Sequence, residues 1–127
     1  MYALSLQREL DACHYLVGGD WGSENEPHTH HYRIELRLEG ATLDEHNYLV
    51  DLVEVEARLD SIAAYYRDRT LNDLPQFAGR NPSIEWFARC LCEDLSSQFQ
   101  ASNLSAITFR VWENDVAWAA YRKEPAH

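Results

Sequence analysis

The chain has 127 residues, with 11 Lys+Arg against 21 Asp+Glu and a formal net charge of −10. This length fits one domain over 1–127, and 46% hydrophobic residues are enough for a buried core. The acidic balance argues against binding to nucleic acid or to an anionic membrane surface, because both require basic patches. A small anionic substrate is still possible, because a local metal or arginine pocket can outweigh the net field.

The cellular location is predicted to be the cytoplasm. No apolar stretch approaches the roughly 20 residues of a membrane helix, and the N-terminus lacks the basic-then-apolar order of a signal peptide. The cysteines are Cys13, Cys90 and Cys92, an odd and sparse set that indicates a reducing environment. Cys90 and Cys92 are interpreted as core thiols rather than as a metal or redox pair, because residues two apart on a helix point in different directions.

The first part of the chain is predicted to form strands. Alternating apolar and polar residues indicate a strand within the first 16 residues, and a polar, glycine-rich loop follows over 18–27. Loops of this composition often fold over a functional site. The clearest strand covers 30–39, with apolar residues on one face and charged residues on the other. After a turn at Gly40, 43–50 is predicted to return as an antiparallel strand.

The middle of the chain is predicted to be helical. Apolar residues step by three or four over 52–66, which indicates an amphipathic helix, and Asp51 is placed to cap it. The connector 67–82 contains Pro75, Gly79 and Pro82, which interrupt regular structure. Ser83 is predicted to be the N-cap of a second helix over 84–99.

The last quarter alternates again, with strands predicted over 107–112 and 116–122 and a turn at 114–115. Apart from the return strand over 43–50, the order is ββ-αα-ββ, which indicates an α+β domain with a four-stranded antiparallel sheet and both helices on one face. Such a sheet has open edges, which oligomerisation would close.

Three histidines suggest a metal site. His28 and His30 are separated by one residue, so on a strand both side chains point to the face that carries its apolar residues. His14, at the end of the first strand, can lie beside them if the two strands pair. Three neutral imidazoles suit Zn²⁺ and leave its fourth position open for water or substrate, as in catalytic sites. The alternative is a chance surface pair, with His14 a hydrogen-bonded core histidine.

Glu113 is the second informative position. It shares the alternation of Ile107, Phe109 and Val111, which turns its carboxylate toward the apolar side. A buried carboxylate needs a partner, and a ligand with two adjacent N–H donors would provide a bidentate one. Alternatively, the strand ends at Trp112 and Glu113 faces solvent.

Short stretches in order along nearly the whole chain resemble the motifs of the 6-pyruvoyltetrahydropterin synthase family, which includes 6-carboxytetrahydropterin synthase. They are Leu10-Asp11-Ala12-Cys13-His14, His28-Thr29-His30-His31-Tyr32, Leu49-Val50-Asp51-Leu52, Leu71-Asn72-Asp73, Asn81-Pro82-Ser83-Ile84-Glu85, and Val111-Trp112-Glu113-Asn114 with the later Tyr121.

The resemblance implies a tunnelling fold (T-fold), in which the sheets of three subunits close into a barrel and two trimers stack into a homohexamer. It also implies that His14, His28 and His30 bind zinc and that Glu113 anchors the 2-amino and N3 edge of a pterin. Family members act on 7,8-dihydroneopterin triphosphate, with the zinc polarising side-chain oxygens while a base removes a carbon-bound proton. An enzyme that uses this substrate is expected to act in a pathway such as queuosine or folate biosynthesis.

The chain departs from the family pattern at the proton-transfer groups. Glu24 stands where the family has its catalytic cysteine, which resembles a subgroup that cleaves the dihydroneopterin side chain. Glu24 is therefore the candidate base, with Glu26 a competitor and an exposed loop carboxylate the alternative. The family's Asp–His pair is replaced by Arg67 and Asp68, which leaves Asp68 as the candidate for the second proton transfer, with His31 and His46 as alternatives.

Two functional hypotheses follow. The first is a zinc-dependent pterin lyase with Glu24 as base. The second is a non-catalytic homo-oligomer that binds a pterin- or purine-like ligand and has lost the proton-transfer groups.

Overall fold

The computed structural model describes residues 1–125. Its elements are β1 (Tyr2–His14), β2 (His28–Gly40), α1 (Leu52–Tyr66), α2 (Ile84–Gln98), β3 (Ala106–Trp112) and β4 (Trp118–Lys123), with short 3-10 helices η1 (Gly22–Asn25), η2 (Leu71–Asp73) and η3 (Pro75–Phe77). None of the described helices has the length and apolar character needed to span a membrane.

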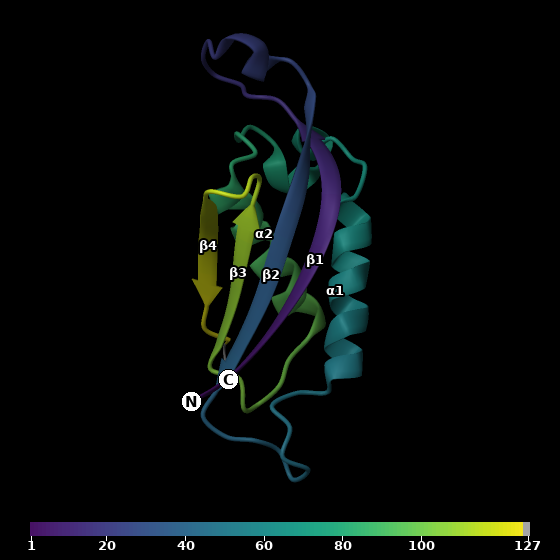
Figure 1. Cartoon of the computed structure of the whole chain (residues 1–127), viewed down its shortest axis with the longest axis vertical. Coiled ribbons are helices and arrows are strands. Elements are labelled where there is room, and N and C mark those ends of the chain that lie inside the picture. The colour runs from purple at the N-terminus through teal and green to yellow at the C-terminus, as the bar shows by residue number, and fades with distance from the viewer. Residues whose placement is uncertain (126–127) are drawn as a thin grey trace.

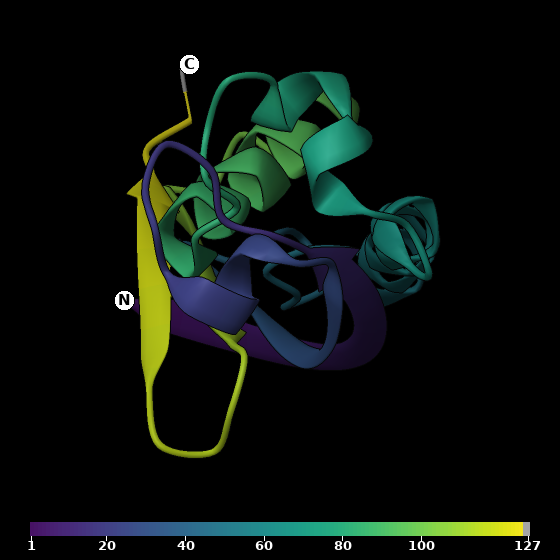
Figure 2. The ribbon, with the colours of Figure 1, turned by 90° about the horizontal axis from the view of Figure 1, so that it is seen from above.

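The four strands form one antiparallel sheet in the order β1-β2-β3-β4. Both helices lie on one face of this sheet (Figures 1 and 2). The α+β architecture with an antiparallel four-stranded sheet and two helices on one face is therefore confirmed. The free edges are β1 and β4.

The core lies between the sheet and the helices, because β2 buries one face and each helix buries one apolar stripe against it. Tyr32, Ile34, Leu36 and Leu38 of β2 are fully buried, and they alternate with partly exposed charged residues. The helices contribute Val55, Leu59 and Ile62 from α1 and Phe87, Leu91 and Leu95 from α2. Both predicted caps are confirmed, because Asp51 accepts from the N–H groups of Val53 and Glu54, and Ser83 accepts from that of Trp86.

One end of the sheet is only two strands wide. β1 pairs with β2 over the full 13 residues of each strand, whereas β3 reaches along β2 only to Arg33. Residues 10–14 and 28–32 therefore project beyond the four-stranded part as a two-stranded ribbon (Figure 1). The connector after α1 braces it, because the Asp68 N–H donates to the Asp11 carbonyl (2.7 Å) and the Cys13 N–H to the Arg69 carbonyl (2.8 Å).

The strand predicted over 43–50 is wrong. Local turn hydrogen bonds and side chains, rather than a neighbouring strand, pair with the backbone of this segment. The Asp44 carboxylate accepts from the N–H groups of His46 (2.9 Å) and Tyr48 (3.0 Å), and Asn47 has a positive φ of 69°. The segment is therefore a loop, which Asn103 ties down.

Several predicted boundaries also shift, among them that β2 is His28–Gly40 rather than 30–39. β1 ends at His14 because the next backbone N–H, that of Tyr15, donates to Asn72 (3.0 Å). β4 begins at Trp118 because the Asn114 side chain accepts from the two N–H groups of 116–117. α2 ends at Gln98, one residue earlier than expected.

Replacing Asn103 tests how this loop is held. The Asn103 Nδ2 group donates to the carbonyl oxygens of Thr42 (3.0 Å) and Leu49 (2.8 Å). We expect Asn103→Ala to lower the free energy of unfolding in urea by about 1–3 kcal/mol, since both carbonyls lose their partner. The neighbouring exposed Ser102→Ala is the control and should change it by less than about 0.5 kcal/mol. Equal stability of the two variants would contradict this role of Asn103.

Candidate metal centre

The three predicted histidines converge on the helix-facing side of the two-stranded ribbon. Strand register accounts for this, because His14 lies opposite His28, and His30 lies two residues further along β2. The ring centroids are 4.6 Å apart for His14 and His28, 4.5 Å for His14 and His30, and 4.9 Å for His28 and His30. The convergence expected from the sequence is thus what the structure has.

Glu24 completes the cluster from the loop between β1 and β2. It lies on η1, and its carbonyl accepts from the Leu16 N–H at 2.9 Å, which folds the loop back toward the end of β1. Glu24 Oε2 is 3.2 Å from His28 Nε2. One ligand atom from each of Glu24, His14, His28 and His30 lies within 4.8 Å of the others. Three imidazole nitrogens therefore lie close enough to share one ion, with the Glu24 carboxylate beside them.

Hydrogen bonds orient two of the rings. His28 Nδ1 donates to the Glu26 carbonyl at 2.7 Å, so His28 Nε2 carries the lone pair. That Nε2 atom is buried and forms no hydrogen bond, although Glu24 Oε2 lies 3.2 Å away. His14 Nδ1 is 2.7 Å from the Tyr32 hydroxyl, which leaves His14 Nε2 toward the cluster. Carbonyl or hydroxyl partners of this kind orient histidines that bind metals.

Burial keeps His14 neutral. Its side chain is 4% exposed, and burial together with the neighbouring His30 and His28 lowers the pKa of His14 to about 4. Neutral imidazole is the form that binds a metal ion. An orphaned buried nitrogen on His28, a neutral His14 and one nearby carboxylate fit a borderline-soft divalent cation such as Zn²⁺.

Glu113 lies close to this cluster without joining it. It directly follows β3, which ends at Trp112, and it is half-buried. Burial, with a smaller contribution from the Glu113 charge, raises the pKa of Tyr32, the residue whose hydroxyl contacts His14. Within residues 1–125 the Glu113 carboxylate has no hydrogen-bond or ion-pair partner, so it is available to a ligand.

The other two sequence candidates lie outside the group of ligand atoms. Asp68 is exposed and has a positive φ of 61°, and its backbone N–H, not its carboxylate, contacts β1. Glu26 is exposed, and its backbone carbonyl orients His28. Of the two loop glutamates, Glu24 is therefore the one whose carboxylate lies among the histidines.

Three asparagines hold the loop between β1 and β2 in place, a role that was not predicted from the sequence. Asn25 Nδ2 donates to the carbonyls of Leu16 and Gly19 (both 3.0 Å), and its Oδ1 accepts from the Trp21 N–H (2.7 Å). Asn72 accepts from the Tyr15 N–H and donates to its carbonyl, and Asn81 accepts from the Val17 N–H. Asn72 and Asn81 belong to motifs recognised in the sequence, but only the fold places them against the loop.

Comparison with known families settles the assignment. The family model described as 6-pyruvoyl tetrahydropterin synthase matches residues 3–124. The chain belongs to the 6-pyruvoyl tetrahydropterin synthase family. Among curated proteins, no match is found.

Solved structures of 6-pyruvoyl tetrahydropterin synthases share the fold. The Plasmodium falciparum structure superposes with a TM-score of 0.82 at 12% identity, covering 97% of this chain and 98% of that chain. The Caenorhabditis elegans structure has a TM-score of 0.80 at 21% identity and covers 98% of both chains. A Plasmodium vivax structure has a TM-score of 0.77 at 11% identity, covering 98% of this chain and 99% of that chain. The subunit fold expected of a T-fold protein is thus confirmed.

Removing the Asn25 amide should loosen the loop that carries Glu24. We expect Asn25→Ala to increase hydrogen–deuterium exchange at the amides of 16–26, because three hydrogen bonds worth about 0.5–1.5 kcal/mol each are lost. Exchange in α1 should stay unchanged. Ser23→Ala in the same loop is the control, and equal exchange in both variants would refute the role of Asn25.

Proposed function

We propose that the chain is a zinc-dependent pterin lyase acting on the side chain of 7,8-dihydroneopterin triphosphate or a related dihydropterin. The observation that carries this proposal is the placement of the Glu24 carboxylate among three histidines whose nitrogens form a metal-compatible donor set. Membership of the 6-pyruvoyl tetrahydropterin synthase family supports the pterin chemistry.

Relatives with a catalytic glutamate support Glu24 as the base. Two Plasmodium vivax 6-pyruvoyltetrahydropterin synthase structures are described as catalytic-residue mutants, with a glutamate replaced by alanine in one and by cysteine in the other. This chain likewise has a glutamate, rather than a cysteine, in the loop before His28.

The residues of this chain take separate roles. Glu24 accepts a proton from a side-chain carbon of the substrate, as a carboxylate within reach of the reacting group can. Glu113 accepts two hydrogen bonds from the 2-amino and N3 edge of the pterin. Asp68 handles the second proton. His14, His28 and His30 would hold Zn²⁺, which supplies Lewis-acid polarisation of a substrate oxygen when bound.

The working unit in this proposal is a cytoplasmic homohexamer made of two trimers. The sheet leaves β1 and β4 as free edges, and pairing of these edges between copies closes a barrel without an exposed strand. Asp68 is exposed and outside the cluster of its own chain, which is consistent with sites shared between subunits.

Metal binding can be measured without activity. Competition with a chromophoric chelator should show that His14→Ala, His28→Ala and His30→Ala each weaken zinc binding by more than about 100-fold, since each removes a ligand. His46→Ala, on the exposed loop at 41–51, is the control and should leave zinc affinity unchanged. Zinc affinity that survives all three ligand substitutions would exclude this centre as the metal site.

Turnover of 7,8-dihydroneopterin triphosphate by the zinc-loaded protein tests the base. We expect Glu24→Gln and Glu24→Ala to lower kcat by about 10²–10⁴-fold, the usual contribution of a general base. Glu26→Gln, which keeps the backbone carbonyl bonded to His28, should remain within about twofold of the parent. Activity indifferent to both Glu24 substitutions would rule this residue out. Tight pterin binding without turnover in the unmodified protein would instead favour the non-catalytic binder.

A further inference from the structure

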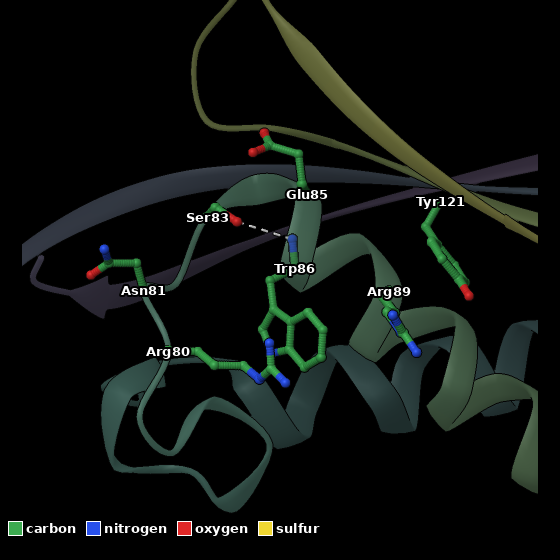
Figure 3. A pocket seen from close by; sticks show the side chains of 7 residues that line it. All are labelled: Arg80, Asn81, Ser83, Glu85, Trp86, Arg89 and Tyr121. Carbon is green, nitrogen blue, oxygen red and sulfur yellow. Dashed lines mark hydrogen bonds between the residues drawn. The ribbon is translucent and has the colours of Figure 1, made fainter. Parts of the chain in front are cut away.

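An open, shallow cavity lies at the start of α2, and its lining includes none of the four residues of the metal centre. Its volume is about 490 Å³, within the usual range for small-molecule sites, and it is lined by residues between 80 and 89 and by Tyr121 of β4 (Figure 3).

Two arginines are held in this cavity by aromatic rings. The Arg80 guanidinium carbon lies 3.9 Å from the ring centroid of Trp86. That of Arg89 lies 5.3 Å from the Trp86 ring and 5.4 Å from the Tyr121 ring. The indole of Trp86 is itself fixed, because its Nε1 donates to the Gln76 carbonyl at 2.9 Å. Ring faces attract the two cations without using their N–H donors.

Those donors are not used by the part of the chain that the structure describes. Within residues 1–125, neither the Arg80 nor the Arg89 guanidinium forms an ion pair or donates a hydrogen bond. Other arginines of this acidic chain do pair with carboxylates, as Arg8 does with Asp60 and Arg110 with Glu35. Two guanidiniums without a carboxylate partner thus contact the same Trp86 ring in a chain with a net charge of −10.

The remaining polar groups also favour an anion. Asn81 Oδ1 accepts from the Val17 N–H, which leaves the Asn81 Nδ2 group as a donor. Ser83 Oγ accepts from the Trp86 N–H, which leaves its own O–H free to donate. Glu85 is the acid in this lining, and Figure 3 shows its side chain directed away from Arg80 and Trp86.

We propose that this cavity binds phosphate groups, as free polyphosphate or as the phosphate chain of a small metabolite. Guanidinium groups form bidentate, charge-assisted hydrogen bonds with phosphate oxygens, and two of them here have their donors available. The site does not rest on the proposed lyase activity. The cavity is connected to the loop that carries Glu24 by one hydrogen bond, from the Val17 N–H to Asn81 Oδ1.

Isothermal titration of the full chain with inorganic triphosphate tests the site. We expect saturable binding that Arg80→Gln and Arg89→Gln each weaken by at least about tenfold, because each loses a charged donor pair. Arg58→Gln on α1 is the control, because it changes the net charge equally and Arg58 is not among the lining residues. The triphosphate affinity of this variant should stay within about twofold of the parent. Both cavity arginines are exposed, so these variants should keep the parental melting temperature.

His28→Ala separates this site from the metal centre and should leave triphosphate binding unchanged. A second readout is the indole N–H resonance of Trp86, assigned by its loss in Trp86→Phe, which should shift on titration even if an arginine variant folds poorly. A nucleoside triphosphate that binds more tightly than inorganic triphosphate identifies a metabolite as the source of the phosphate, and equal affinity identifies free polyphosphate.

The proposal is overturned if millimolar triphosphate shows no saturable binding. It is also overturned if Arg58→Gln weakens binding as much as the cavity variants, which would indicate general electrostatics, or if binding is lost in His28→Ala.

Discussion

The full-length pairing of β1 with β2 is the constraint on which the candidate site depends. Its register sets His14 opposite His28, and the alternation of β2 places His30 on the same face. A slip of one residue would turn every side chain of one strand to the other face. It would then expose the apolar series that begins at Tyr32 and disperse the histidines. Core burial and site geometry are thus specified by the same register.

Much of this arrangement could be predicted from the sequence, because it depends on the short repeat of apolar residues along strands and helices. The alternation of β2 and the three-and-four spacing of α1 are local, and so are the caps at Asp51 and Ser83. The approach of His14 to His28 could also be predicted, because it needs only two adjacent strands to pair. Recognition of several motifs in order added the fold type and the expectation for Glu113.

What the sequence could not provide depends on long-range side-chain hydrogen bonds. The segment 43–50 has strand-like composition, yet Asp44 and the distant Asn103 satisfy its backbone and make it a loop. Likewise, nothing local to Asn72 or Asn81 reveals that each contacts the chain just after His14. The basic cavity beside Trp86 was hidden for a related reason, because the net charge of −10 masks a local pair of cations.

The two-stranded ribbon beneath the histidines couples the geometry of the centre to the packing of the core. A two-stranded hairpin is marginally stable on its own. This one is held because Leu10, Ala12 and Tyr32 are buried in the core, and because the Asp68 N–H and the Arg69 carbonyl bond to the backbone of β1. The Tyr32 ring packs against Phe87 of α2 while its hydroxyl contacts His14 Nδ1. A change in how α2 packs on the sheet would therefore be transmitted through Tyr32 to the orientation of a candidate ligand.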